Sequence, residues 1–221
     1  SGGVPENFAN YFIIEFNRPF SDFGTWNGDG EIFSNNELSG AHVGSYVSFL
    51  NNENISIEAR VSSSFISHDQ AKINLDREIP SHQSFEMTKK IAKNAWNDEL
   101  SRIKIKPLSV KNNQNHLNAK NKAKSDIIKF YSSLYRTLLY PREFYEYNDK
   151  GEQIHYSPYN GKIEDGPLYT DNGFWDTFRA VFPFYTLLYP EKLGEILEGI
   201  MVNPYKESGW LPEWSSPGHR D

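Results

Sequence analysis

Alternating apolar and polar residues dominate the first third of the chain and predict β-strands. From Ile55 to Phe65, apolar side chains occupy one face and Ser, Glu and Arg the other, which is the period of two of a half-buried antiparallel strand. Ala41–Phe49 and Tyr11–Phe16 predict two further strands, Trp26–Phe33 predicts a strand end with a glycine-rich turn, and residues 51–54 predict an asparagine-rich turn. Several short antiparallel strands in succession suggest a β-sandwich.

From Ser84 onward the apolar residues recur at spacings of three and four, which predicts amphipathic helices. The first helix ends near Arg102, and the second contains Ile127–Leu139 and stops before a proline. A third is expected over Thr170–Glu191, with a kink at an internal proline, and a fourth begins at Pro190. Helices that follow strands in a separate block indicate an α+β or two-domain chain, not a doubly wound sheet.

Two connecting segments complete the prediction. Lys106–Lys124 is polar and irregular and is interpreted as a linker, with some helix at its end. Phe144–Tyr156 predicts a small hairpin that turns at Asp149-Lys150-Gly151. The Asn148–Glu152 stretch lacks the ligand spacing of a calcium loop, so the hairpin turn is the preferred interpretation.

Composition excludes several classes of protein. The 221 residues carry a net charge of −6, which argues against non-specific nucleic-acid binding, and the lysine-rich stretch from Ser81 to Phe130 is interpreted as a solvated helix face and loop. There are no cysteines, so disulfides and thiolate metal sites are excluded. The six histidines lack helical metal-ligand spacing. No apolar run is long enough to span a membrane.

The most informative chemistry is the start of the third predicted helix, "DNGFWDTFR". Asp171 or Asn172 can cap the helix, and Asp176 could simply pair with Arg179 one turn later. The alternative is that Trp175 and Asp176 face a cleft, because an indole offers a flat apolar platform to a sugar and a carboxylate can accept hydrogen bonds from two adjacent hydroxyls. The loop "GWLPEWSSPGHRD" adds two tryptophans and polar groups. Alone, these features predict only a possible carbohydrate site.

Together the two blocks resemble glycoside hydrolase family 92, the calcium-dependent exo-α-mannosidases of bacteria. The resemblance rests on "LYTDNGFWDTFRAVFPFYTLLYPE" followed by "GWLPEWSSPGHRD". It extends to "FYSSLYRTLLYPREF", to "AWNDELSRIKI" and to "SSFISHDQAKINLDREIP", so it covers nearly the whole chain in the family's order.

The resemblance implies the C-terminal part of an antiparallel β-sandwich followed by the first helices of an (α/α)₆ toroid. The expected divisions are a partial sandwich over residues 1–80, a linker helix and loop over 81–123, and a partial toroid over 124–221. It also implies an inverting hydrolase of terminal α-mannosyl residues in glycans, with calcium as cofactor and export to the bacterial periplasm or outside the cell. No nucleic-acid partner is expected.

For the site, the resemblance implies substrate binding by a set of side chains from the two blocks. These are Trp175, Asp176, Phe174, Trp214, His219 and Asp221. No catalytic residue is assigned in this chain, because the resemblance places the general acid, the general base and most calcium ligands downstream of Asp221. The calcium ligands stay unknown.

The chain offers only three or four of the helices that a toroid needs, so we expect a fragment that is inactive alone and leaves apolar faces uncovered. Two alternatives stay open: a non-catalytic carbohydrate-binding module that uses the same Trp and Asp surface, and another (α/α)₆ glycosidase. Binding of mannose without turnover would favour the first, and activity insensitive to chelators would favour the second.

Overall fold

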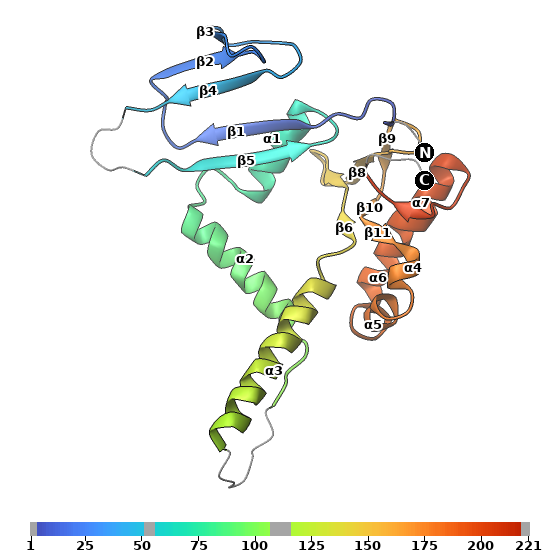
Figure 1. Ribbon diagram of the computed structural model, residues 1–221. Helices are drawn as coiled ribbons and strands as arrows, with labels where there is room; N and C mark the ends of the chain where they lie inside the picture. Colours follow the sequence, from blue (N-terminus) through green and yellow to red (C-terminus); the bar gives the residue numbers. More distant parts are fainter. Residues whose placement is uncertain (1–3, 51–55, 107–115, 218–221) are drawn as a thin grey trace. The chain divides into compact units, whose positions relative to one another are not determined.

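The computed structural model describes residues 4–50, 56–106 and 116–217 (Figure 1). The chain separates into two compact units, one formed by Ile13–Ser62 and the other by Ser1–Phe12 together with Ser63–Asp221. Both α and β structure are present: strands occur over residues 11–64 and again over 142–173 and 214–215, the two longest helices lie between these regions, and shorter helices follow from residue 174. The strands and helices are therefore not divided into two separate blocks, as the sequence predicted, because short strands recur among the later helices. Within the described ranges, no helix is both long and apolar enough to cross a bilayer.

The smaller unit consists of two short sheets. Strand β1 (Tyr11–Phe16) has the bounds predicted from the sequence and pairs with β5 (Ala59–Ser64). A second sheet has the order β3-β2-β4, from β3 (Ile32–Phe33), β2 (Asp22–Trp26) and β4 (Gly44–Ser48), with antiparallel pairs. The predicted glycine-rich turn joins β2 to β3, whereas the predicted turn at residues 51–54 lies outside the described residues.

The apolar face of β5 and of the residues just before it was predicted to be buried, but it is largely exposed. Val61 is 55% exposed and Ile57 is 41% exposed, whereas Ser64, assigned to the polar face, is 1% exposed. The alternation itself is present, but a two-stranded sheet has no second layer of its own to cover its apolar side. Exposure of this face agrees with the expectation that the chain leaves apolar surface uncovered.

Helix α1 (His68–Glu78) was not predicted from the sequence, where its residues were assigned to the end of the sandwich. Ser67 caps it, with its Oγ accepting a hydrogen bond from the backbone N–H of Gln70 at 3.0 Å. Ala71 and Leu75 are buried on its inner face. The polar side chains of Gln70 and Asn74 bind the β7 strand described below, at Tyr147 O and Glu146 Oε2, so α1 belongs to the larger unit.

Two long helices follow. Helix α2 (Phe85–Leu100) begins at the predicted Ser84, whose Oγ accepts from the Met87 N–H, and none of its residues is fully buried. Helix α3 (His116–Thr137) starts earlier than predicted, within the segment interpreted as linker. The Trp96 and Tyr135 rings join the two helices, with centroids 4.5 Å apart.

Three small sheets follow α3, and their strand pairings position the segments that carry the candidate functional residues. Strand β6 (Arg142–Glu143) pairs with β10 (Tyr169–Thr170). Strands β7 (Glu146–Tyr147), β8 (Gln153–Tyr156) and β9 (Ile163–Asp165) form an antiparallel sheet whose first turn is the predicted hairpin. Strand β11 (Asn172–Gly173) pairs with β12 (Trp214–Ser215).

The predicted helix over Thr170–Glu191 is wrong as a single element. It is divided into α4 (Phe174–Thr177) and α5 (Val181–Leu188). Pro183 lacks an N–H, and its ring would clash with the carbonyl of residue 179 in a continuous helix. A restart at Val181 puts Pro183 in the first turn, where no intrahelical N–H bond is needed.

The predicted cap of this helix is also wrong. Gly173 occupies the cap position of α4 without a side-chain hydrogen bond. Asp171 instead forms an ion pair with Arg142, and Asn172 is buried.

The core of the larger unit lies between α5, α6 (Pro190–Leu197) and the β10 strand. Helix α6 begins at the predicted Pro190 and continues through a π-helical turn, η1 (Glu198–Val202), into α7 (Asn203–Ser208). The buried core side chains come from these segments and from β10. They are Tyr169, Tyr185, Tyr189, Ile196 and Ile200.

Candidate functional site

The β11–β12 ladder brings together the two sequence blocks that carry the candidate chemistry. Asn172 lies opposite Ser215, and Gly173 lies opposite Trp214. Helix α4 starts immediately after β11, so Trp175 and Asp176 project from the first turn beyond the ladder. The pairing therefore places the "FWD" segment beside the second tryptophan of "GWLPEW".

Trp175 and Trp214 form an open aromatic surface. Their ring centroids are 6.2 Å apart and their planes are inclined by 51°. Trp175 is 69% exposed and Trp214 is 37% exposed, so both indoles present ring area to solvent. Two inclined indoles of this kind offer apolar faces to a ligand that itself has apolar and polar sides, such as a sugar.

Gly173 allows Trp214 and Asp176 to approach the same point. A Cβ at this glycine would lie 2.2 Å from the Trp214 ring and 2.7 Å from Asp176 Oδ2, both far inside contact distance. The indole and the carboxylate consequently adjoin the same side of the Gly173 backbone. The sequence prediction did not identify Gly173; its position directly before Phe-Trp-Asp was the available signal.

The Asp176 carboxylate is exposed and available. It forms no hydrogen bond or ion pair with another side chain in the described part of the chain, and the alternative pairing with Arg179 is not formed there. Arg179 instead lies over the Phe178 ring, 5.2 Å from its centroid. Asp176 can therefore accept hydrogen bonds from a ligand without first breaking a protein contact.

The remaining predicted site residues are distributed differently. Phe174 is partly buried and packs against the core cluster. His219 and Asp221 lie outside the described residues. Trp210, which was not among the predicted site residues, is 79% exposed on the same loop as Trp214.

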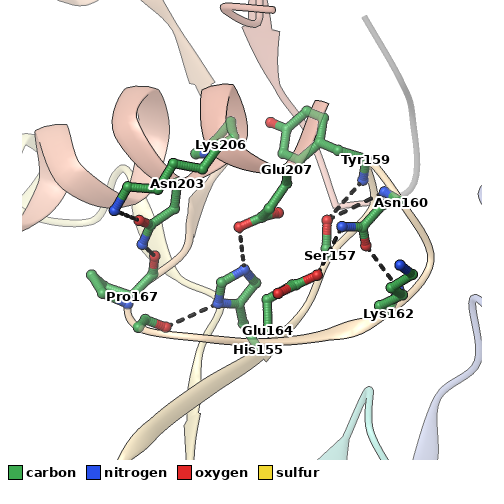
Figure 2. Close-up of polar contacts among 12 residues, drawn as sticks. His155, Ser157, Tyr159, Asn160, Lys162, Glu164, Pro167, Asn203, Lys206 and Glu207 are labelled. Atoms are coloured by element: carbon green, nitrogen blue, oxygen red, sulfur yellow. Dashed lines mark hydrogen bonds and ion pairs between the residues drawn. The ribbon is translucent and has the colours of Figure 1, made fainter. Parts of the chain in front are cut away.

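Three polar contacts fasten the segment from α7 to β12, which carries Trp214, to the chain before β11. Asn203 donates from Nδ2 to Pro167 O at 2.8 Å, and Ser215 donates from Oγ to Tyr169 O at 2.6 Å. Between them, Glu207 Oε1 lies 3.0 Å from His155 Nε2 (Figure 2). The loop between α7 and β12 is thus held at both ends.

The described residues do not form a metal site. No group of three or more His, Asp or Glu side chains gathers in a ligand arrangement within the described ranges. A calcium ion takes six to eight oxygen ligands, and Asp176 supplies one carboxylate beside the indoles. The side chains at hand therefore do not fit a calcium site by themselves.

Comparisons with known proteins agree with this arrangement. Residues 1–64 match the glycosyl hydrolase family 92 N-terminal domain, and residues 70–221 match the glycosyl hydrolase family 92 catalytic domain. The family resemblance predicted from the two sequence blocks is confirmed.

Solved structures and a curated relative extend the match. An inverting family 92 mannosidase of Bacteroides thetaiotaomicron is 42% identical, with a TM-score of 0.85 over 100% of this chain and 28% of that one. A family 92 α-mannosidase of the same organism, solved with mannoimidazole, shares the fold at 20% identity, with a TM-score of 0.73 over 96% and 27%. An uncharacterized secreted glycosidase of Arthroderma benhamiae is 28% identical over 177 residues, which are 77% of this chain and 16% of that protein.

The chain spans less than a third of the length of each of these relatives. The catalytic-domain match contains both "NGFWDTFR" and "GWLPEW", the two blocks that the β11–β12 ladder joins. Because the two family models together match nearly the whole chain, the chain belongs to glycosyl hydrolase family 92.

Proposed function

We propose that the full-length protein containing this sequence is an inverting exo-α-mannosidase that removes terminal α-mannosyl residues from glycans. In this proposal the chain supplies one wall of the sugar site. The observation that carries it is the ladder that brings Trp175, Asp176 and Trp214 together inside a family 92 catalytic-domain match. The 42% identical structure described as an inverting mannosidase supports the same reaction.

The three side chains have separate roles in the proposal. The exposed Asp176 carboxylate accepts hydrogen bonds from two adjacent sugar hydroxyls, an arrangement that a carboxylate satisfies well because it has two acceptor oxygens. Trp175 and Trp214 pack against the apolar faces of the sugar and exclude water from one side. Together they bind and orient the terminal mannose.

The acid and the base are proposed to come from elsewhere. Inversion requires a general acid and a general base about 6.5–9.5 Å apart, so that a water molecule fits between the base and the sugar. We assign Asp176 to binding and expect both catalytic carboxyls beyond Asp221. The chain by itself is therefore expected to bind mannosides weakly and not to hydrolyse them.

Calcium is part of the proposal only as a cofactor of the full-length protein. Most of its ligands are expected beyond Asp221, and the described residues do not complete a metal site by themselves. A bound calcium ion would supply additional coordination for vicinal sugar hydroxyls. Export from the cell is proposed by analogy with the relative described as secreted.

The test is proton NMR of α-1,2-, α-1,3- and α-1,6-mannobiose with the full-length protein and with this chain alone. We expect the full-length protein to release mannose first as the β-anomer, to lose activity in EDTA and to recover it with added calcium, while this chain alone releases none. First release of the α-anomer would contradict inversion, and activity in EDTA would contradict the calcium requirement. Binding without turnover of any mannoside by the full-length protein would leave a non-catalytic carbohydrate-binding protein as the better function.

A further inference from the structure

A buried pair of titratable side chains, His155 and Glu207, joins β8 to α7, the helix that precedes the segment carrying Trp214. The His155 side chain is fully buried, and the Glu207 side chain is 6% exposed. They come from strand β8 and helix α7 and are separated by 52 residues in the sequence (Figure 2). Neither takes part in the proposed sugar contacts, so their contacts have to be explained by another role.

The hydrogen-bond partners of His155 determine how the pair is protonated. Nδ1 lies 2.9 Å from the carbonyl oxygen of Gly166, which can only accept, so Nδ1 carries a hydrogen and donates. Nε2 lies 3.0 Å from Glu207 Oε1, and two bare acceptors would not approach so closely. One proton therefore lies between Nε2 and Oε1, and the two side chains are joined by a single directed hydrogen bond.

The His155–Glu207 hydrogen bond lies at the end of α7, where the chain begins the loop that leads to Trp214. His155 is fastened to Gly166, and Asn203 at the start of α7 donates to the next residue, Pro167. Glu207 is one turn after Asn203 on α7, and the chain leaves α7 through Gly209, whose φ is 80°. The bond thus fixes the last turn of α7 against the β8–β9 hairpin immediately before the tryptophan loop begins.

Glu207 is not satisfied as a purely structural carboxyl would be. Its second oxygen, Oε2, is buried and has no hydrogen-bond partner among the described residues. Burial, with a contribution from the nearby Glu207 charge, also raises the pKa of Tyr159 to about 12. A buried carboxyl with one unsatisfied oxygen contributes little to net stability, because its desolvation offsets the bond that it makes.

We propose that Glu207, through its hydrogen bond to His155, is a positioning residue that sets the place of Trp214 in the sugar site. The relevant property is the reach of the side chain: the carboxyl has to span the gap from α7 to the imidazole. Its charge is not needed, because a glutamine amide can donate to the Nε2 of a neutral His155. The proposal rests on the mannosidase function only for its kinetic readout.

Two nearly isosteric variants of the full-length protein separate reach from charge. Glu207→Gln keeps the reach and removes the charge, whereas Glu207→Asp keeps the charge and shortens the reach by one methylene. Glu164→Gln is the matched control, since Glu164 lies opposite His155 on β9 and its carboxylate accepts from Asn160 instead. The readouts are the 19F resonance of 5-fluorotryptophan at Trp214, assigned with Trp214→Phe, the 15N resonances of the His155 ring, and kcat and KM on a mannobiose.

The proposal expects Glu207→Gln to keep the Trp214 resonance, a protonated Nδ1 on His155 and a KM within about threefold of the unsubstituted protein. Glu207→Asp is expected to shift or broaden the Trp214 resonance and to raise KM by ~10-fold or more, with a smaller change in kcat, because misplacing a contact group weakens binding of the sugar. Glu164→Gln should leave all three readouts unchanged.

If Trp214 keeps its resonance in Glu207→Asp but is displaced in Glu207→Gln, the role of Glu207 is electrostatic and the proposal is overturned. The proposal is also overturned if both variants leave Trp214 in place. If the full-length protein acts on no mannoside, the 19F and 15N spectra still decide whether Glu207 positions Trp214. Failure of the proposed function and failure of this inference are therefore distinguishable.

Discussion

Trp214 lies opposite Gly173 in the β11–β12 ladder, and its indole ring covers the place where a side chain on that residue would project. Asp176 Oδ2 borders the same place. One glycine backbone thus supports both an aromatic and an acidic element of the candidate sugar site. The relationship makes the size of residue 173 a determinant of the site.

Gly173→Ala is expected to displace Trp214, because the new methyl would lie 2.2 Å from its ring. Overpacking of this kind costs about 1–3 kcal/mol, and the displaced indole should also weaken mannoside binding. The measurements are the thermal melting temperature and the KM of the full-length protein. The control is Gly194→Ala in α6, where the added Cβ meets nothing within 4 Å and should stabilise the helix by ~0.5–1 kcal/mol. Unchanged KM and stability in Gly173→Ala would show that Trp214 is not confined by the glycine.

Asp176→Asn is expected to weaken substrate binding without unfolding the protein. The exposed carboxylate makes no ion pair in the described part of the chain, so its loss should leave the melting temperature unchanged. A hydrogen bond to a charged group contributes about 1.5–3 kcal/mol, which predicts a fall in kcat/KM of at least ~10-fold. Kinetics on a mannobiose provide the measurement, and Glu198→Gln, on the exposed side of η1, provides the control. Full activity of Asp176→Asn would remove Asp176 from the site.

Ile200→Ala tests the core that supports the site. Ile200 is fully buried in the cluster with Tyr169, and truncation of a buried Ile typically costs about 2–5 kcal/mol. Val202→Ala is the matched control, because Val202 is 46% exposed and should change stability by less than ~0.5 kcal/mol. Both are compared by thermal melting. Equal losses in the two variants would contradict the assignment of the core.

Glu195 should make stability depend on acid pH. Burial would raise the pKa of its carboxyl, but the hydrogen bond from Tyr145 at 2.8 Å and the charge of Lys192 outweigh burial and hold the pKa below its usual 4.5. As the pH falls, Glu195 is therefore protonated in the unfolded chain before it is protonated in the folded one. Its contribution to the free energy of unfolding is present above pH 4.5 and is lost as the pH falls through the lower pKa of the folded state. Glu195→Gln should melt at a lower temperature than the unsubstituted protein at neutral pH, and this difference should narrow in acid. A difference that stayed constant across this range would show that Glu195 does not titrate with folding.

Local patterns in the sequence determined the elements whose hydrogen bonds are local. The bounds of β1, the start of α2 after Ser84, the hairpin at Asp149–Gly151 and the start of α6 at Pro190 were all predicted from residues within a few positions of each feature. The break between α4 and α5 has an equally local cause, because Pro183 cannot lie in the middle of a helix. A kink was predicted at this proline instead of two helices, because the apolar spacing continues through it. The two motif blocks also sufficed to predict the family.

What the tertiary structure decided is which distant residues meet. No local signal in Asn172–Gly173 or in Trp214–Ser215 specifies that these short strands pair, and none in His155 specifies Glu207 as its partner. Strand register and the packing of α7 are set by burial over the whole unit, so they cannot be predicted from the residues next to each strand or helix. The sequence by itself therefore determined β1, the starts of α2 and α6, the hairpin and the family, whereas only the folded chain placed Gly173 against Trp214 and His155 against Glu207. Those contacts depend on segments that become neighbours only after the chain has packed.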